Sequence, residues 1–145
     1  MHKIIFLDID GVLNNTALGT KDKEIWKLFN DIDTDGGRLS SINIKNLNDI
    51  TDQTGADIVI SSTWRILHEF HDLVTILKDA GVTGNIIDYT PGLGGRGIRR
   101  GNEIQCYIED HYPSAYNYWP TNLRLFAWCL QWCHRLSTFG LRKLA

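Results

Sequence analysis

The stretch Ile4-Ile-Phe-Leu-Asp-Ile-Asp-Gly-Val-Leu-Asn14 joins a short apolar run to two aspartates. Such a run, ended by Asp8, is typical of a strand that is buried on both faces, as in a parallel sheet. Asp8 and Asp10 are two residues apart, so in an extended chain their side chains point to the same side. The stretch therefore predicts a buried strand at 3–7 with two carboxylates at its carboxyl end, where open α/β sheets bind ligands.

Strands and helices alternate through the first 110 residues. Apolar runs predict two further strands, at 57–60 and 85–89. The spacing of apolar residues predicts helices from Ser40 or Ser41 to Gly55, from Trp64 to just before Gly81, and over 101–110. Because alternating elements of this length pair in parallel, we expect one doubly wound α/β domain, which suits a chain of 145 residues.

The composition excludes several classes of protein. Hydrophobic residues make up 43% and charged residues 22%, as in an ordinary globular protein. The net charge of −2 does not indicate a nucleic-acid or membrane-surface binder. Three cysteines do not form a disulfide framework, and Asp8 interrupts the first apolar run before it resembles a signal peptide. With no apolar run of roughly 20 residues, we expect no membrane span and a reducing cytoplasm.

The second predicted strand ends in a second polar motif, Ile58-Val-Ile-Ser-Ser-Thr-Trp-Arg65. Together with residues 4–14, it resembles the first two motifs of the haloacid dehalogenase (HAD) superfamily of phosphohydrolases. The similarity is greatest to the small HAD-like domains of phage and bacteria with a Ser-Ser-x-Trp-Arg signature, a group that includes domains of RNA-repair proteins. The resemblance covers residues 1–110 and implies a Rossmann-like fold without a large cap.

The resemblance also implies a phosphatase mechanism with Mg²⁺ as cofactor. Asp8 would attack phosphorus to give an aspartyl phosphate, and Asp10 would protonate the leaving group and then activate water. Ser61 and Ser62 would bind the phosphoryl group, while Asp8 and Asp10 would hold the metal. An acid at the second position favours a phosphatase over an ion pump or a dehalogenase. The substrate would be a phosphorylated small molecule, a nucleotide or a nucleic-acid end.

The third motif of the superfamily is a Lys or Arg that offsets charge between the phosphate and the nucleophile. In similar sequences an Arg-Gly-x-Glu-Ile segment opens the helix, and residues 100–104 match it. Arg100 is therefore the candidate base, with Arg99 and Arg96 as rivals.

The fourth motif does not match. The superfamily expects an apolar strand that ends in one or two acids, but residues 113–120 read Pro-Ser-Ala-Tyr-Asn-Tyr-Trp-Pro and no acid follows Asp110. Glu109 and Asp110 lie in the preceding predicted helix, where we expect them not to reach the site. One carboxylate from Asp8, the backbone carbonyl of Asp10 and water should bind Mg²⁺ weakly. We expect the last core strand to be atypical or missing and activity to be impaired.

The end of the chain also differs in charge. All 17 acids lie at or before Asp110, and four Lys and Arg follow it. We expect an HAD-like core at 1–112 and a basic aromatic tail at 113–145. One hypothesis is that residues from 114 onward arise from a reading-frame shift. It would be supported if another reading frame of the gene continued Pro113 into an apolar strand that ends in two aspartates. The competing hypothesis for the tail is a genuine amphipathic helix. The alternative to a phosphatase is a non-catalytic remnant whose tail binds a partner or a membrane surface.

Two other motifs match known ligand sites only in part. Asp31-Ile-Asp-Thr-Asp-Gly36 begins like a calcium loop, but Ile42 stands where the twelfth-position Glu belongs. We expect an acidic surface loop there, bordering the active site. Residues 92–97 match Gly-x-Gly-x-x-Gly, but they follow the third strand rather than the first. We expect a loop near the substrate, not a dinucleotide site.

Overall fold

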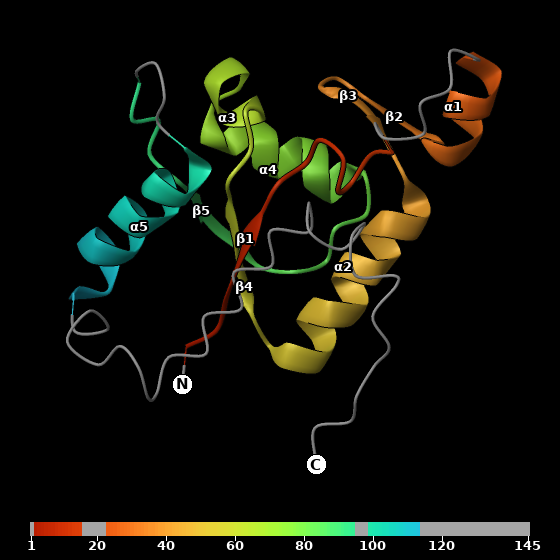
Figure 1. Ribbon diagram of the computed structural model, residues 1–145. Helices are drawn as coiled ribbons and strands as arrows, with labels where there is room; N and C mark the ends of the chain where they lie inside the picture. Colours follow the sequence, from red (N-terminus) through yellow and green to blue (C-terminus); the bar gives the residue numbers. More distant parts are fainter. Residues whose placement is uncertain (1, 16–22, 95–98, 114–145) are drawn as a thin grey trace, which may run out of the picture.

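Three parallel strands form the centre of the protein (Figure 1). The computed structural model describes residues 2–15, 23–94 and 99–113. Strands β1 (Ile4–Leu7), β4 (Asp57–Ile60) and β5 (Ile86–Tyr89) lie in the order β1-β4-β5. Leu7 of β1 pairs with Ile60 of β4, so the two strands end at the same level. The three predicted strands and their parallel pairing are confirmed.

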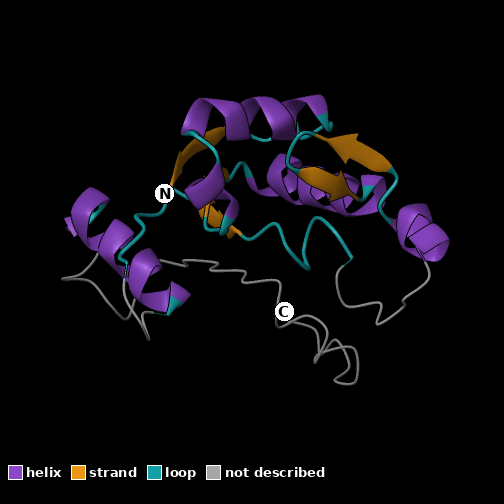
Figure 2. Ribbon diagram, turned by 90° about the horizontal axis from the view of Figure 1, so that it is seen from above, coloured by secondary structure: helices purple, strands orange, loops and turns teal. Residues whose placement is uncertain are grey.

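Helices cover both faces of this sheet, as a doubly wound fold requires (Figure 2). Alternate strand residues point to opposite faces. Helices α2 (Ser41–Thr54) and α4 (Phe70–Asp79) cover one face, and α5 (Arg100–His111) covers the other. Leu7, Ile58 and Ile60 are buried on the first face, and Ile4, Phe6 and Val59 on the second. Burial of each large apolar side chain contributes roughly 1.5–3 kcal/mol, so these side chains fix the sheet between its helices.

The predicted helix after Ser40 forms as α2, but another residue caps it. It stops at Gly55, whose φ of 63° is the left-handed conformation that glycine adopts without strain. Ser40 is the N-cap residue, yet its side chain makes no capping hydrogen bond. The backbone N–H of Ser41 donates instead to Asp31 Oδ1 at 2.8 Å. The carboxylate therefore satisfies a helix donor from ten residues upstream.

The helix predicted from Trp64 is divided in two. Helix α3 (Trp64–Leu67) ends at His68, whose backbone is extended, and α4 begins after Glu69, which is also extended. Gly81 follows the end of α4 as expected and has a φ of 102°. The apolar spacing is continuous through the break, so it did not reveal these two extended residues. The predicted helix over 101–110 is confirmed as α5.

Residues 23–39 differ most from the sequence analysis. Helix α1 (Lys23–Phe29) was not predicted. The aspartates of the segment 31–36 are exposed as expected, but the segment is not a loop, because β2 (Ile32–Thr34) and β3 (Gly37–Leu39) form an antiparallel hairpin there. Its apolar residues Ile32 and Leu39 pair directly, and Leu39 is fully buried in the core. Cross-strand burial therefore outweighs the acidic composition of the segment.

In the described part of the chain, no strand pairs with the outer edge of β1. Residues 114–145, on which the predictions about the tail and the last strand fall, lie outside the described residues. No described helix combines the length and the apolar character needed to cross a bilayer.

The Asp31 cap makes stability depend on pH. Hydrogen bonds from the Ser41 hydroxyl and backbone N–H hold the pKa of Asp31 below its ordinary value of 3.8. A lowered folded-state pKa means that this contribution is complete above about pH 3.8 and is lost as the pH falls through the folded-state pKa. Asp31→Ala should cost about 1 kcal/mol at neutral pH in urea unfolding. The difference in the free energy of unfolding between this variant and the wild type should become smaller as the pH falls below the unfolded-state pKa of Asp31. A difference that stayed constant down to pH 2 would contradict the charged cap.

Candidate active site

The ends of the three parallel strands bring together residues that are distant in sequence. Asp8, Ser61 and Thr90 each follow a strand, and all three are buried. The backbone N–H of Ser61 donates to Leu7 O at 2.7 Å, and that of Thr90 donates to Ile60 O at 2.9 Å. The Thr90 hydroxyl donates to Ser61 Oγ at 3.4 Å. Thr90 was not singled out from the sequence, although its place directly after a strand was a usable signal.

The Asp8 carboxylate is buried opposite a guanidinium group. Its side chain is 7% exposed, and Oδ1 accepts the backbone N–H of Ile9 at 2.9 Å. Arg100 Nη1 lies 3.6 Å from the same oxygen. This Nη1 is buried and has no hydrogen-bond partner among the described residues. Since buried donors are almost always paired, this group beside Asp8 is suited to bind an anionic acceptor.

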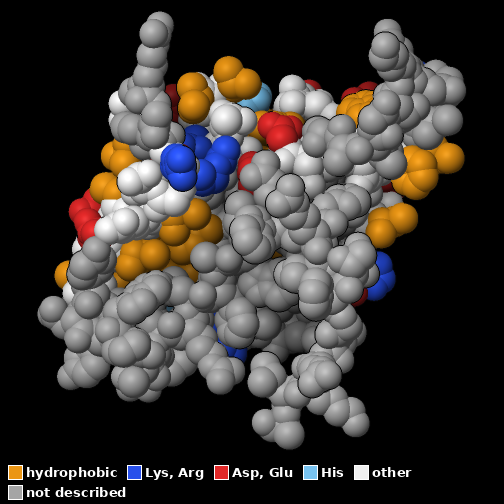
Figure 3. Space-filling view, in the orientation of Figure 1, with side chains coloured by type: hydrophobic (Ala, Val, Ile, Leu, Met, Phe, Trp, Pro, Cys, Tyr) orange, Lys and Arg blue, Asp and Glu red, His pale blue; other side chains and the backbone are white. Residues whose placement is uncertain are grey.

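Of the three candidate basic residues of the third motif, the structure describes Arg99 and Arg100. Arg100 is the first residue of α5 and pairs with Asp8. Arg99 is exposed, and its backbone N–H donates to Asn102 Oδ1 at 3.3 Å. Arg96 lies outside the described residues. Figure 3 shows Lys and Arg side chains gathered on the surface near the start of α5.

Asp10 lies in a tight turn after β1 and is held by several donors. Gly11 has a φ of 79°, a conformation that favours glycine, and its N–H donates to Asn14 Oδ1 at 2.7 Å. Asn14 Nδ2 donates in turn to Asp10 Oδ1 at 3.0 Å. Trp64 Nε1 donates to the same oxygen at 3.2 Å, and the Thr63 hydroxyl donates to Oδ2 at 3.4 Å. Trp64 and Thr63 were not predicted as site residues.

An ion pair joins α3, which follows β4, to the first turn of α5. Arg65 Nη2 lies 2.6 Å from Glu103 Oε2, with side chains only 4% and 15% exposed. The Nη1 of Arg65 donates to the backbone carbonyl of Ser62. The Ser62 hydroxyl accepts the backbone N–H of Trp64 at 3.5 Å, which engages it in the loop. Arg65 therefore connects the loop that carries Ser61 and Ser62 to the helix that carries Arg100.

A pocket of about 530 Å³ opens beside these groups. It lies where α3, the end of β5 and the first turn of α5 approach one another. Its wall combines the Arg65 and Glu103 pair with Tyr89, Thr90 and glycine backbone. Gly92 and Gly94 of the glycine-rich loop contribute to this wall, whereas residues 95–98 lie outside the described part.

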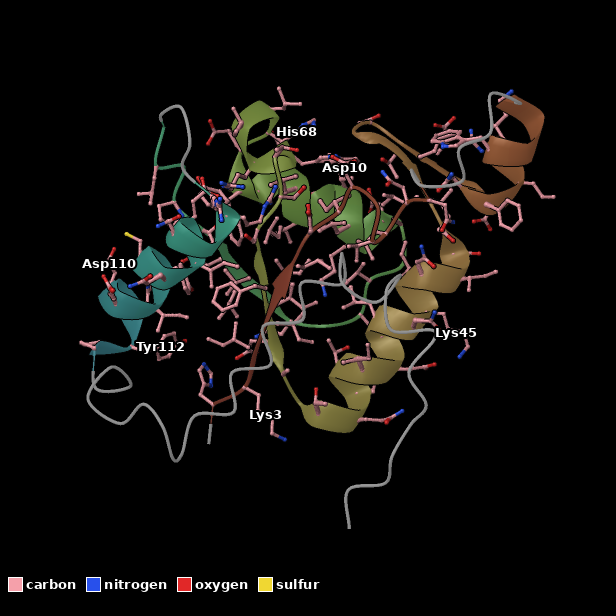
Figure 4. The ribbon with its side chains drawn as sticks, viewed as in Figure 1. Lys3, Asp10, Lys45, His68, Asp110 and Tyr112 are labelled. Atoms are coloured by element: carbon pink, nitrogen blue, oxygen red, sulfur yellow. The ribbon has the colours of Figure 1, made fainter. Side chains whose placement is uncertain are left out.

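The described residues offer few ligands for a metal ion. They contain no group of three or more His, Cys, Asp and Glu side chains that could hold one. Asp110 lies on α5 well away from Asp10 (Figure 4). Both contacts described above for the Asp8 carboxylate involve Oδ1, so Oδ2 can face a cation or phosphorus. A Mg²⁺ ion bound by Asp8 would therefore have to keep most of its water, because the described residues do not enclose it.

The Arg65–Glu103 pair should contribute strongly to stability. Arg65→Met would leave the largely buried Glu103 carboxylate without its partner, and breaking a buried pair in this way costs about 3–5 kcal/mol. Urea unfolding would measure the loss. Lys45→Met is the matched control, because Lys45 forms an exposed pair with Asp49 and should cost less than about 1 kcal/mol. Equal costs for the two variants would contradict the structural role of Arg65.

Comparison with known proteins identifies the family of this chain. Comparison with curated proteins and with solved structures found no match. The family described as "HAD domain in Swiss Army Knife RNA repair proteins" matches residues 4–119. This range includes the turn that carries Asp8 and Asp10, the Ser-Ser-Thr-Trp-Arg segment and the whole of α5. The chain is a HAD-like domain of the hydrolase type and belongs to the family of HAD domains in Swiss Army Knife RNA repair proteins.

Proposed function

We propose that the protein is a Mg²⁺-dependent phosphomonoester phosphatase that works through an aspartyl phosphate on Asp8. The observation that carries this proposal is the buried Asp8 carboxylate facing Arg100 Nη1, a buried donor without a hydrogen-bond partner among the described residues. A phosphoryl oxygen is an acceptor that such a donor would bind. Ser61 at the adjacent strand end supplies a hydroxyl for the same group.

The chemistry divides between the two aspartates. Asp8 Oδ2 attacks phosphorus, the ester P–O bond breaks, and Asp10 gives a proton to the leaving oxygen. Asp10, now a carboxylate, takes a proton from water, which attacks phosphorus. The bond between Asp8 and phosphorus then breaks to release inorganic phosphate. The first step leaves Asp8 phosphorylated and Asp10 deprotonated, and the second step restores both carboxyl groups, so the enzyme can turn over.

The remaining groups would stabilise negative charge. Arg100 and Ser61 hydrogen-bond to the phosphoryl oxygens as charge develops. Mg²⁺ would be held by Asp8, the backbone carbonyl of Asp10 and the substrate phosphate, and when bound it offsets charge on the phosphoryl oxygens. Members of the HAD family generally use this ion, and the small set of protein ligands leads us to expect a high Mg²⁺ requirement.

The family and the pocket support a phosphorylated substrate. A phosphorylated small molecule, a nucleotide and a nucleic-acid end all present a phosphomonoester. The description of the matched family as RNA-repair domains supports a phosphorylated RNA end. The pocket beside the site has room for the group attached to the phosphate, with Tyr89 as an aromatic wall.

Two substitutions test the mechanism with p-nitrophenyl phosphate and millimolar Mg²⁺. Asp8→Asn should abolish turnover because it removes the nucleophile. Arg100→Ala should reduce kcat by on the order of 100-fold, the usual cost of losing one donor to a developing negative charge. Release of p-nitrophenolate measures both effects.

Matched controls come from the same helix. Arg99→Ala and Asp110→Asn remove an exposed charge next to Arg100 and a carboxylate far from Asp10, and both variants should keep wild-type turnover. No turnover by the wild-type protein at any Mg²⁺ concentration would instead support the non-catalytic remnant.

A further inference from the structure

Trp64 is a buried residue whose polar atom contacts Asp10. Its side chain lies in the core, with the residue 6% exposed. The indole Nε1–H can only donate a hydrogen bond, and a buried indole needs an acceptor. Asp10 Oδ1 accepts it at 3.2 Å. A Phe at this position would fill most of the same space but would lack the donor.

The β2–β3 hairpin fixes the position of the Trp64 ring. A Cβ on Gly36 would overlap Cζ3 of Trp64 and lie 2.8 Å from Cε3, so only glycine fits there. The end of the hairpin is also joined to the turn that carries Asp10, because Ser40 N–H donates to Leu13 O at 2.8 Å. Hairpin, indole and carboxylate thus form a continuous chain of contacts.

We infer that Trp64 is a positioning residue for the acid–base function of Asp10, with Gly36 holding its ring in place. The inference rests on the proposed function, since it assigns Asp10 the proton transfers. The contact between Trp64 and Asp10 itself does not depend on catalysis and can be tested separately.

The hydrogen bonds also select one oxygen of Asp10 for proton transfer. Two N–H donors, from Asn14 and Trp64, point at Oδ1 and would clash with a proton there. Among the described residues, Oδ2 has only the longer contact from the Thr63 hydroxyl at 3.4 Å. Oδ2 is therefore the oxygen less engaged by protein donors, and the proton transfers of the proposed mechanism are assigned to it.

The test compares two substrates that differ in their need for a proton. An alkyl phosphate releases an alkoxide that must be protonated, whereas p-nitrophenyl phosphate releases a stable anion. Trp64→Phe should lower kcat/KM for the alkyl phosphate about tenfold, as expected for one hydrogen bond to a charged group. For p-nitrophenyl phosphate, kcat/KM should change less than about twofold. Inhibition by inorganic phosphate should stay unchanged, because phosphate binding does not use the indole.

A pair of glycine variants tests the hairpin. Gly36→Ala should reproduce the selective loss on the alkyl phosphate because it displaces the Trp64 ring. Gly84→Ala is the control, since its Cβ would lie 2.8 Å from Ile58 Cδ1 and 2.9 Å from Thr51 Cγ2, away from Asp10. Gly84→Ala should lower the stability of the protein without changing the ratio of kcat/KM between the two substrates. Equal losses on both substrates in Trp64→Phe or Gly36→Ala would overturn the inference.

Nuclear magnetic resonance of the full chain tests the contact without any turnover. The indole N–H resonance of Trp64 is identified by its disappearance in Trp64→Phe. It should shift in Asp10→Asn, because a carboxylate acceptor is replaced by an amide, and stay in place in Asp110→Asn. If the chemical shift of the Trp64 indole N–H were unchanged in Asp10→Asn, the inference would be overturned even if the protein is an active phosphatase. An inactive wild type in which this shift occurs would overturn the proposed function and leave the contact established.

Discussion

The pairing of the buried Asp8 carboxylate with the Arg100 guanidinium is the interaction on which the site depends. A charge at this depth is costly unless another charge or a set of donors compensates it. The Ile9 N–H and Arg100 Nη1 both approach Oδ1, and the parallel sheet brings Ser61 to the same level. Arg100 Nη1 has no hydrogen-bond partner among the described residues, so it can donate a hydrogen bond to a bound anion. This geometry supports the proposed phosphate site beside Asp8 and Arg100.

The elements around this pair control its geometry from two sides. On one side, Arg65 connects the loop after β4 to the first turn of α5, so Ser61 and Arg100 are positioned together. On the other side, the hairpin and Trp64 hold the carboxylate of Asp10. The two side chains that make these contacts, Trp64 and Arg65, are consecutive residues of α3. A single turn of chain thereby positions Ser61 and Arg100 relative to Asp10.

The sequence was most informative where the physical signal is local. Apolar runs and the Asp8–Asp10 spacing predicted the strands and the doubly wound fold, because burial on both faces of a parallel sheet leaves that pattern. Thr90 and Trp64 were missed because their roles depend on contacts across 29 and 54 positions. The hairpin was missed because its acidic residues concealed the paired Ile32 and Leu39. The roles of Asp8, Asp10, Ser61, Ser62 and Arg100, and of the tail, remain predictions.

The most direct test of the central claim is to trap the phosphorylated protein. The Asp10→Asn variant, incubated with p-nitrophenyl phosphate and Mg²⁺, can still be phosphorylated because this leaving group needs no proton, but it lacks the base that activates water. Intact-mass measurement followed by peptide mapping should find one phosphoryl group, located on Asp8. No phosphoryl group under these conditions, or one on another residue, would contradict an aspartyl-phosphate mechanism at Asp8.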